Sequence, residues 1–173
     1  MIYVILLKTN LFLPLKKKNK MKELEPNTIE SSELVEQTFN FWFTDNEHIR
    51  PPFPEYIRPI LKEKAVDLFF KWVSGLNPKA KDEMNDEMVA EKFEEIIFET
   101  ASHLVKTDDE KITIQYPFLP RLNDEISANE NPDLKSKIID RALLKEGDDS
   151  FLKVKAEELA SKKVWETKFE LPL

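Results

Sequence analysis

Residues 51–76 read PPFPEYIRPILKEKAVDLFFKWVSGL, and this stretch has the strongest helical periodicity in the chain. At about 100° per residue, one broad face collects the apolar side chains of Ile57, Leu61, Ala65, Leu68, Phe69, Trp72 and Leu76. The pattern predicts an amphipathic helix that starts near the prolines and ends with Gly75 in a left-handed C′ position. Val66, Phe70 and Val73 extend the apolar surface onto a second flank, which predicts a second neighbour.

Two further helices are expected on either side of this stretch. Upstream, Ser31 or Ser32 is the expected N-cap of a helix that buries Val35, Phe39 and Trp42. Downstream, residues 88–105 form a helix whose inward stripe is Val89, Phe93, Ile96, Ile97, Thr100 and Leu104. Phe98 and Val105 lie on the far side of that helix. They therefore predict either another packing neighbour or an exposed apolar patch.

The C-terminal third predicts a mixture of elements. Residues 107–111 read as a turn, and the alternation in 112–116 predicts a strand. Residues 131–146 predict a helix that Gly147 closes, with a buried face of Leu134, Ile138, Ile139, Ala142 and Leu143. The segment 151–163 favours neither strand nor helix throughout, whereas 164–171 alternates as a strand with Trp165, Thr167, Phe169 and Leu171 on one face. The expected class is α+β, dominated by about four to five helices, with a small sheet from the middle and C-terminal strands.

The N-terminal residues differ from the rest of the chain. Residues 1–20 combine an apolar run with five lysines and no acid. We expect residues 1–25 to be a loosely ordered extension or a non-native start, with Met21 as an alternative initiator, and residues 26–173 to be one globular domain. The run is short for a membrane span and is interrupted by Lys8, Asn10 and Pro14. A membrane anchor in residues 1–20 stays open as an alternative.

Composition narrows the classes of function. The chain has no cysteine, which disfavours disulfides and thiolate metal sites and predicts a cytoplasmic location. It has two glycines, too few for a phosphate-binding loop. The net charge is −7, and because residues 1–20 contribute +5 the remainder carries 21 − 33 = −12. An acidic body predicts no binding to nucleic acid and favours a basic partner or simple solubility.

Two side-chain patterns could carry chemistry. Glu95, Glu99 and His103 are spaced four residues apart on one helix edge, a spacing that metal sites use. Lys92 and Lys106 interrupt this edge, and a solvated row of charges is the favoured explanation. Glu166 and Lys168 form a Glu-x-Lys strand, with Asp148 and Asp149 upstream, a layout that could hold a divalent cation and activate a water. Any solvent-facing strand of alternating charge also produces this pattern.

The sequence therefore predicts a non-catalytic protein-interaction domain, an acidic binder or adaptor that needs no cofactor. Its expected partner is another protein, for which a basic surface would suit the acidic body, and the candidate binding surface consists of Val66, Phe70, Val73, Phe98 and Val105. The general character is that of toxin-neutralising immunity proteins, by composition only. The alternative is a metal-dependent hydrolase or nuclease built on Glu166, Lys168 and Asp148 or Asp149. The oligomeric state is left open.

Overall fold

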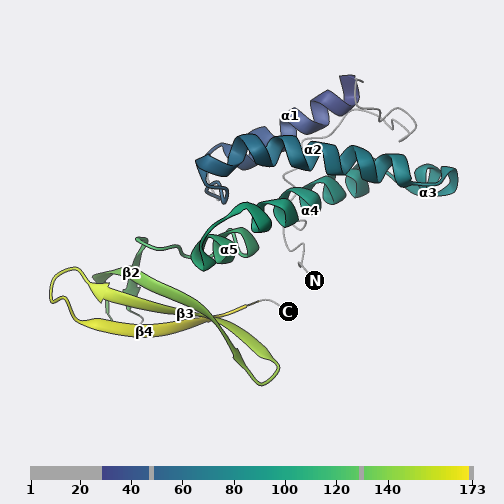
Figure 1. The fold of residues 1–173 in the computed structure, drawn as a ribbon. Coiled ribbons are helices and arrows are strands. Elements are labelled where there is room, and N and C mark those ends of the chain that lie inside the picture. The colour runs from purple at the N-terminus through teal and green to yellow at the C-terminus, as the bar shows by residue number, and fades with distance from the viewer. Residues whose placement is uncertain (1–28, 47–48, 129–130, 172–173) are drawn as a thin grey trace. The chain divides into compact units, whose positions relative to one another are not determined.

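The computed structural model describes residues 29–46, 49–128 and 131–171, and the expected extension at residues 1–25 lies outside them. Among the described residues it contains five α-helices followed by a four-stranded antiparallel sheet, which confirms the α+β class. The chain divides into two compact units at Lys106 and Thr107 (Figure 1). We call them the helical unit and the sheet unit. That residues 26–173 act as one domain stays a prediction.

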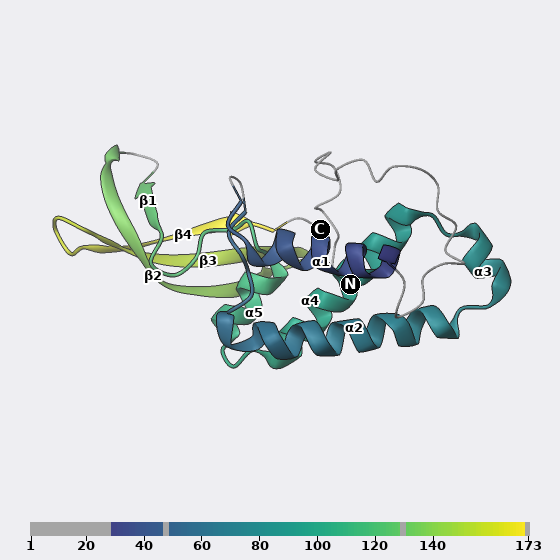
Figure 2. The same ribbon diagram turned by 90° about the horizontal axis from the view of Figure 1, so that it is seen from above.

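The helical unit consists of α1 (Ile29–Phe43), a 3₁₀ turn η3 (Glu55–Ile57), α2 (Arg58–Gly75), α3 (Pro78–Glu83) and α4 (Asp86–Leu104). Helices α2 and α4 run side by side in both views (Figures 1 and 2). Their shared core is aromatic: the Phe93 ring lies 4.7 Å from Phe69 and 5.7 Å from Phe39, measured between centroids. The predicted N-cap at Ser31 or Ser32 is wrong, because α1 already includes both residues.

The buried side of α2 differs from the predicted face. Its buried residues recur at every fourth position, at Leu61, Ala65, Phe69 and Val73. Because four residues turn the helix by 400°, this line winds around the helix instead of staying on one fixed face. Leu68 is therefore exposed and Trp72 half-buried, although both were expected on the core face. The expected left-handed conformation of Gly75 is also wrong, since this residue is the last of α2 and its φ is not positive.

The first element of the sheet unit is a helix where a strand was expected. Helix α5 (Asp108–Gln115) includes the predicted strand 112–116 except for Tyr116. Thr107 caps it, since the Thr107 hydroxyl accepts from the Glu110 N–H and the Glu110 carboxylate accepts from the Thr107 N–H. This reciprocal capping box satisfies two backbone donors and starts a helix at the segment that was expected to be a turn.

The four strands are β1 (Glu125–Ala128), β2 (Asn131–Glu146), β3 (Asp149–Glu158) and β4 (Val164–Glu170), and they pair in chain order. The helix predicted for 131–146 is thus wrong. A bulge between Ile138 and Asp140 shifts the register of β2. Even-numbered residues face the core before the bulge and odd-numbered residues after it, so the alternation of apolar and polar residues is interrupted in the sequence. Gly147, with φ of +65°, begins the two-residue hairpin loop between β2 and β3 and does not end a helix.

The sheet unit has a core of its own. One face of the sheet and α5 together bury Ile112, Ile138, Leu152, Val154 and Leu171. On β4, Trp165, Thr167 and Phe169 are half-buried while Glu166, Lys168 and Glu170 are exposed, which confirms the predicted alternation. This alternation fixes which side chains of β4 face water.

Candidate interaction surface

The apolar flanks predicted as a binding surface are mostly interior. Val73, Phe98 and Val105 are buried in the helical unit. The Phe98 ring lies 4.7 Å from the Trp42 ring and 5.0 Å from Phe53, centroid to centroid, so the far side of α4 has a packing neighbour. Three of the five predicted surface residues are therefore core residues. Val66 and Phe70 are half-buried and keep part of their area exposed.

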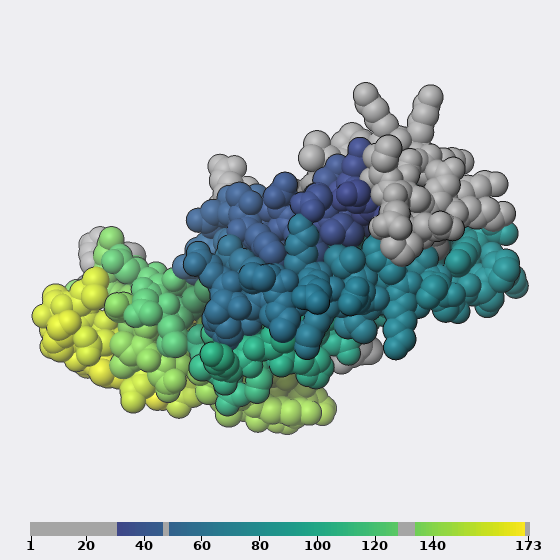
Figure 3. Space-filling view, turned by 45° about the horizontal axis from the view of Figure 1, so that its top comes forward, coloured from purple at the N-terminus to yellow at the C-terminus, as the bar shows by residue number. Residues whose placement is uncertain are grey.

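A different row of α2 carries the exposed apolar side chains. Ile60, Lys64, Leu68 and Trp72 follow one another at every fourth position, parallel to the buried line. Ile60 is 43% exposed and Leu68 46% exposed, and Trp72 is half-buried. We call these four residues the α2 outer row. In the space-filling view the atoms of α2 and α3 form a continuous part of the surface (Figure 3).

Helix α4 carries a row of like charges. Glu87, Glu91, Glu95 and Glu99 occur at every fourth position, and His103 continues the row. Each i,i+4 pair of glutamates costs the helix about 0.2–0.5 kcal/mol. The Lys92 ammonium lies 2.9 Å from the Glu95 carboxylate and offsets part of this repulsion. In the part of the chain that the structure describes, no group of three His, Asp or Glu side chains is arranged to hold a metal, the predicted Glu95, Glu99 and His103 included.

A half-buried carboxylate on α4 meets an indole of α1. The Trp42 indole N–H donates to the Glu94 carboxylate at 3.1 Å. Burial raises the pKa of Glu94 to about 6, with the indole hydrogen bond opposing the change and the nearby charge of Glu91 adding to it. The sequence did not indicate this residue, because Glu94 sits among other α4 glutamates and nothing local marks it as the one that meets an indole.

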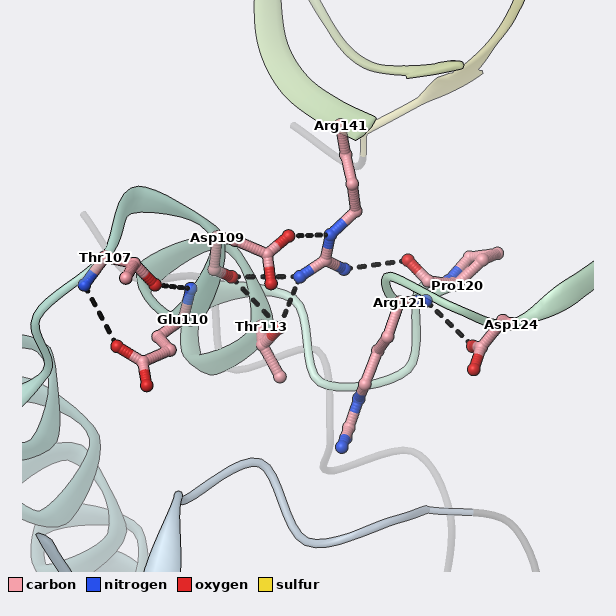
Figure 4. A network of polar contacts seen from close by, with 8 residues as sticks. All are labelled: Thr107, Asp109, Glu110, Thr113, Pro120, Arg121, Asp124 and Arg141. Atoms are coloured by element: carbon pink, nitrogen blue, oxygen red, sulfur yellow. Dashed lines mark hydrogen bonds and ion pairs between the residues drawn. The ribbon is translucent and has the colours of Figure 1, made fainter. Parts of the chain in front are cut away.

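A second polar cluster joins α5 to β2 inside the sheet unit (Figure 4). Arg141 is buried, and its Nε donates to the Asp109 carboxylate at 2.6 Å. Its terminal nitrogens donate to the Pro120 carbonyl at 2.7 Å, to the Asp109 carbonyl at 2.9 Å and to the Thr113 hydroxyl. These four hydrogen bonds make the guanidinium a structural cross-link between α5, β2 and the segment that holds Pro120.

The strand register separates two residues of the hydrolase alternative: Glu166 lies opposite Lys155, six residues along β3 from Asp149. The Glu166 carboxylate lies 2.8 Å from the Lys153 ammonium, and Lys168 pairs with Glu146. The bond from Lys153 lowers the pKa of Glu166. Asp148 and Asp149 are exposed at the hairpin loop. Glu166 and Lys168 are thus exposed members of cross-strand ion pairs, an arrangement that sheets use for stability.

Comparison of the chain with protein-family models, curated proteins and solved structures gives no match. None of the helices in residues 29–46, 49–128 and 131–171 has the length and apolar character that a membrane crossing requires.

Proposed function

We propose that the chain is a non-catalytic interaction protein whose helical unit binds a basic partner protein. The observation that carries the proposal is the row Glu87, Glu91, Glu95 and Glu99. Three like-charge pairs along it cost α4 on the order of 1 kcal/mol, and a cationic partner would turn this cost into attraction. The absence of cysteine favours a cytoplasmic setting for the interaction.

The distribution of charge supports the helical unit as the binding part. Residues 21–106 hold 10 basic and 18 acidic residues, a net charge of 10 − 18 = −8. Residues 107–173 hold 11 basic and 15 acidic residues, a net charge of −4. Residues 1–20 would add five lysines and no acid to the first count, giving −8 + 5 = −3, so the field that attracts a cationic partner is stronger over the helices when this segment is left out. That field would speed association at low salt.

The α2 outer row supplies apolar contact area for the same interaction. Acidic rows accelerate encounter, but exposed apolar side chains that become buried in the complex set its lifetime. Leu68 and Ile60 are the exposed apolar members of this row, and Trp72 adds a half-buried indole. Val66 and Phe70 lie on the opposite flank of α2 and contribute less exposed area.

The test is affinity capture from an extract of the source cells with quantitative mass spectrometry. Three proteins are compared: the unaltered chain, a variant with Glu→Gln at positions 87, 91 and 99, and a control with Glu→Gln at 125, 146 and 157 of the sheet unit. Both variants change the net charge equally, so any difference reports on position. We expect the captured proteins to be basic and their captured amount to fall as the salt concentration rises. The α4 variant should lose them, and the sheet-unit control should retain them.

Leu68→Ser tests the apolar contribution against Leu143→Ser, a substitution of an equally exposed leucine in the sheet unit. Leu68→Ser should raise the dissociation rate with little change in association rate. Acidic captured proteins, or equal losses with both charge variants, would contradict the proposal.

A further inference from the structure

The outer edge of β4 has hydrogen-bonding groups that the sheet does not use. Strand β4 is the last in the order β1-β2-β3-β4, so among the described residues it pairs along one edge only (Figure 1). The Leu171 N–H donates to the Ser150 carbonyl at 2.8 Å, and the Glu158 N–H donates to the Lys163 carbonyl at 2.9 Å. Bonded positions alternate along an antiparallel strand. The backbone groups that point away from β3 are therefore those of Val164, Glu166, Lys168 and Glu170.

The side chains of this edge are complementary to themselves. Residues 165–169 read WETKF, which places an aromatic at each end, opposite charges inside them and Thr167 at the centre. If two such strands lie antiparallel about a two-fold axis at Thr167, each Glu166 faces a Lys168 and each Trp165 faces a Phe169. The bounds Val164–Glu170 are symmetric about the same residue, so this register pairs the whole strand.

We propose that β4 pairs with β4 of a second copy of this chain, antiparallel and centred on Thr167, joining two four-stranded sheets into one.

The hydrogen-bond geometry agrees with this register. Glu166 and Lys168 both direct their backbone groups outward, so each cross-copy pair of these residues is a hydrogen-bonded pair. Thr167 lies on the axis as a non-bonded pair, in which side chains approach most closely. Trp165 and Phe169 form the flanking non-bonded pairs on the same face, and aromatic pairs at such positions stabilise strand association.

The charges along this edge favour pairing with a second copy and do not protect the edge from such association. Edge strands often carry charges that prevent association, and an edge of like charges would repel its own copy. Here the two central charges are opposite, and both belong to cross-strand ion pairs, Glu166 with Lys153 and Lys168 with Glu146. Pairing two copies would extend these contacts into a row Lys153, Glu166, Lys168, Glu146 of alternating sign that crosses the joint.

The experiment is sedimentation velocity of the full chain over concentrations up to about 1 mM. The unaltered chain should form dimers. Glu166→Lys and Lys168→Glu should each weaken the dimer by about tenfold or more, because each places like charges opposite one another twice. The double variant Glu166→Lys with Lys168→Glu restores both opposite-charge pairs and should dimerise again.

Mixing the two single variants gives the sharpest readout. The Glu166→Lys variant has lysine at positions 166 and 168, and the Lys168→Glu variant has glutamate at both. The two variants are therefore complementary, and their mixture should form heterodimers although neither variant dimerises by itself. Recovery in the mixture also shows that each variant is folded. Lys168→Pro removes an outward N–H without touching the bonds to β3, and it should abolish dimerisation.

Three results would overturn the proposal. One is a chain that stays monomeric across the whole concentration range. Another is a dimer that all the variants retain, which would place the contact elsewhere. The third is loss of the dimer with Lys168→Glu but not with Glu166→Lys, which would mean that the strands pair in another register.

Discussion

The half-buried carboxylate of Glu94 makes the stability of the helical unit depend on pH in a specific direction. Burial raises the pKa of Glu94 from its ordinary 4.5 to about 6 in the folded chain. Between these two pH values the folded state binds more protons than the unfolded state, so the free energy of unfolding falls as pH rises. The cost is absent below about pH 4.5 and complete above about pH 7.

The size of the effect follows from the same two values. The difference between them corresponds to about 2 kcal/mol of stability lost at neutral pH. Some solvent contact of the carboxylate reduces this figure, so we expect about 1–2 kcal/mol. Glu94→Gln removes the titrating group and keeps an oxygen that can accept from the Trp42 indole. The variant should be more stable than the unaltered chain by that amount at pH 8 and about equal to it at pH 4.5.

The assay is urea denaturation followed by circular dichroism at 222 nm, at several pH values between 4.5 and 8. Glu99→Gln is the matched control, because Glu99 is exposed on the same helix. It should change stability by less than about 0.5 kcal/mol and without a trend across this range. A constant difference between Glu94→Gln and the unaltered chain at every pH, or a variant that is less stable at pH 8, would refute the reasoning.

Three further changes test the fold and the hydrolase alternative. Gly147→Ala should destabilise the chain by about 1–2 kcal/mol because its φ is +65°, whereas Gly75→Ala should be neutral or stabilising in a helix with open space around it, as thermal melts can measure. Arg141→Met should cost about 1–3 kcal/mol in urea denaturation, because it leaves the half-buried Asp109 carboxylate and two carbonyls without their donor; Lys135→Met, which breaks an exposed ion pair, should cost less than about 1 kcal/mol. If the chain is instead a metal-dependent nuclease, cleavage of nucleic acid with magnesium or manganese should disappear in Glu166→Gln, and such a result would contradict the binding proposal.

The long helices α1, α2 and α4 were predictable because their sequence signals agree with one another. Val35, Phe39 and Trp42 on α1, and Val89, Phe93 and Ile97 on α4, repeat at helical spacing and are buried as expected. The rotation of the buried line on α2 was not predictable, because it depends on the angle at which the neighbouring helices cross, and apolar residues flank that line on both sides.

Helix α5 was mistaken for a strand although its start signal was present. Thr107 and Glu110 have the spacing of a capping box, but Ile112, Thr113 and Ile114 look like a strand alternation. In the structure all three are buried, and the Thr113 hydroxyl donates to the Asp109 carbonyl. A short segment that is buried on every side carries no period, so the cap was the more informative signal.

Strand β2 was mistaken for a helix because its bulge hides the period of two. Ser136 and Ile138 face inward before the bulge and Arg141 after it, so the inward positions change from even to odd. The remaining apolar residues then happen to fall at helical spacing. The Gly147-Asp148 pair could have corrected the helix prediction, because such a dipeptide between two apolar segments favours a two-residue hairpin as much as a helix end.

The exposure of each candidate surface depends on the neighbours that the fold gives it. Phe98 looked surplus because one helix needs only one buried stripe, but α4 packs on two sides and the ring fills the second side against Trp42 and Phe53. Whether an apolar flank is core or interface depends on how many neighbours a helix has, and that number is a property of the fold. For β4, the strand Val164–Glu170 was predictable from local pattern, and so was its charge alternation, but its position at the border of the sheet was not. In the described part of the chain no strand pairs with the outward backbone groups of Glu166 and Lys168, and this position is what makes the alternating pattern of β4 available for the proposed pairing.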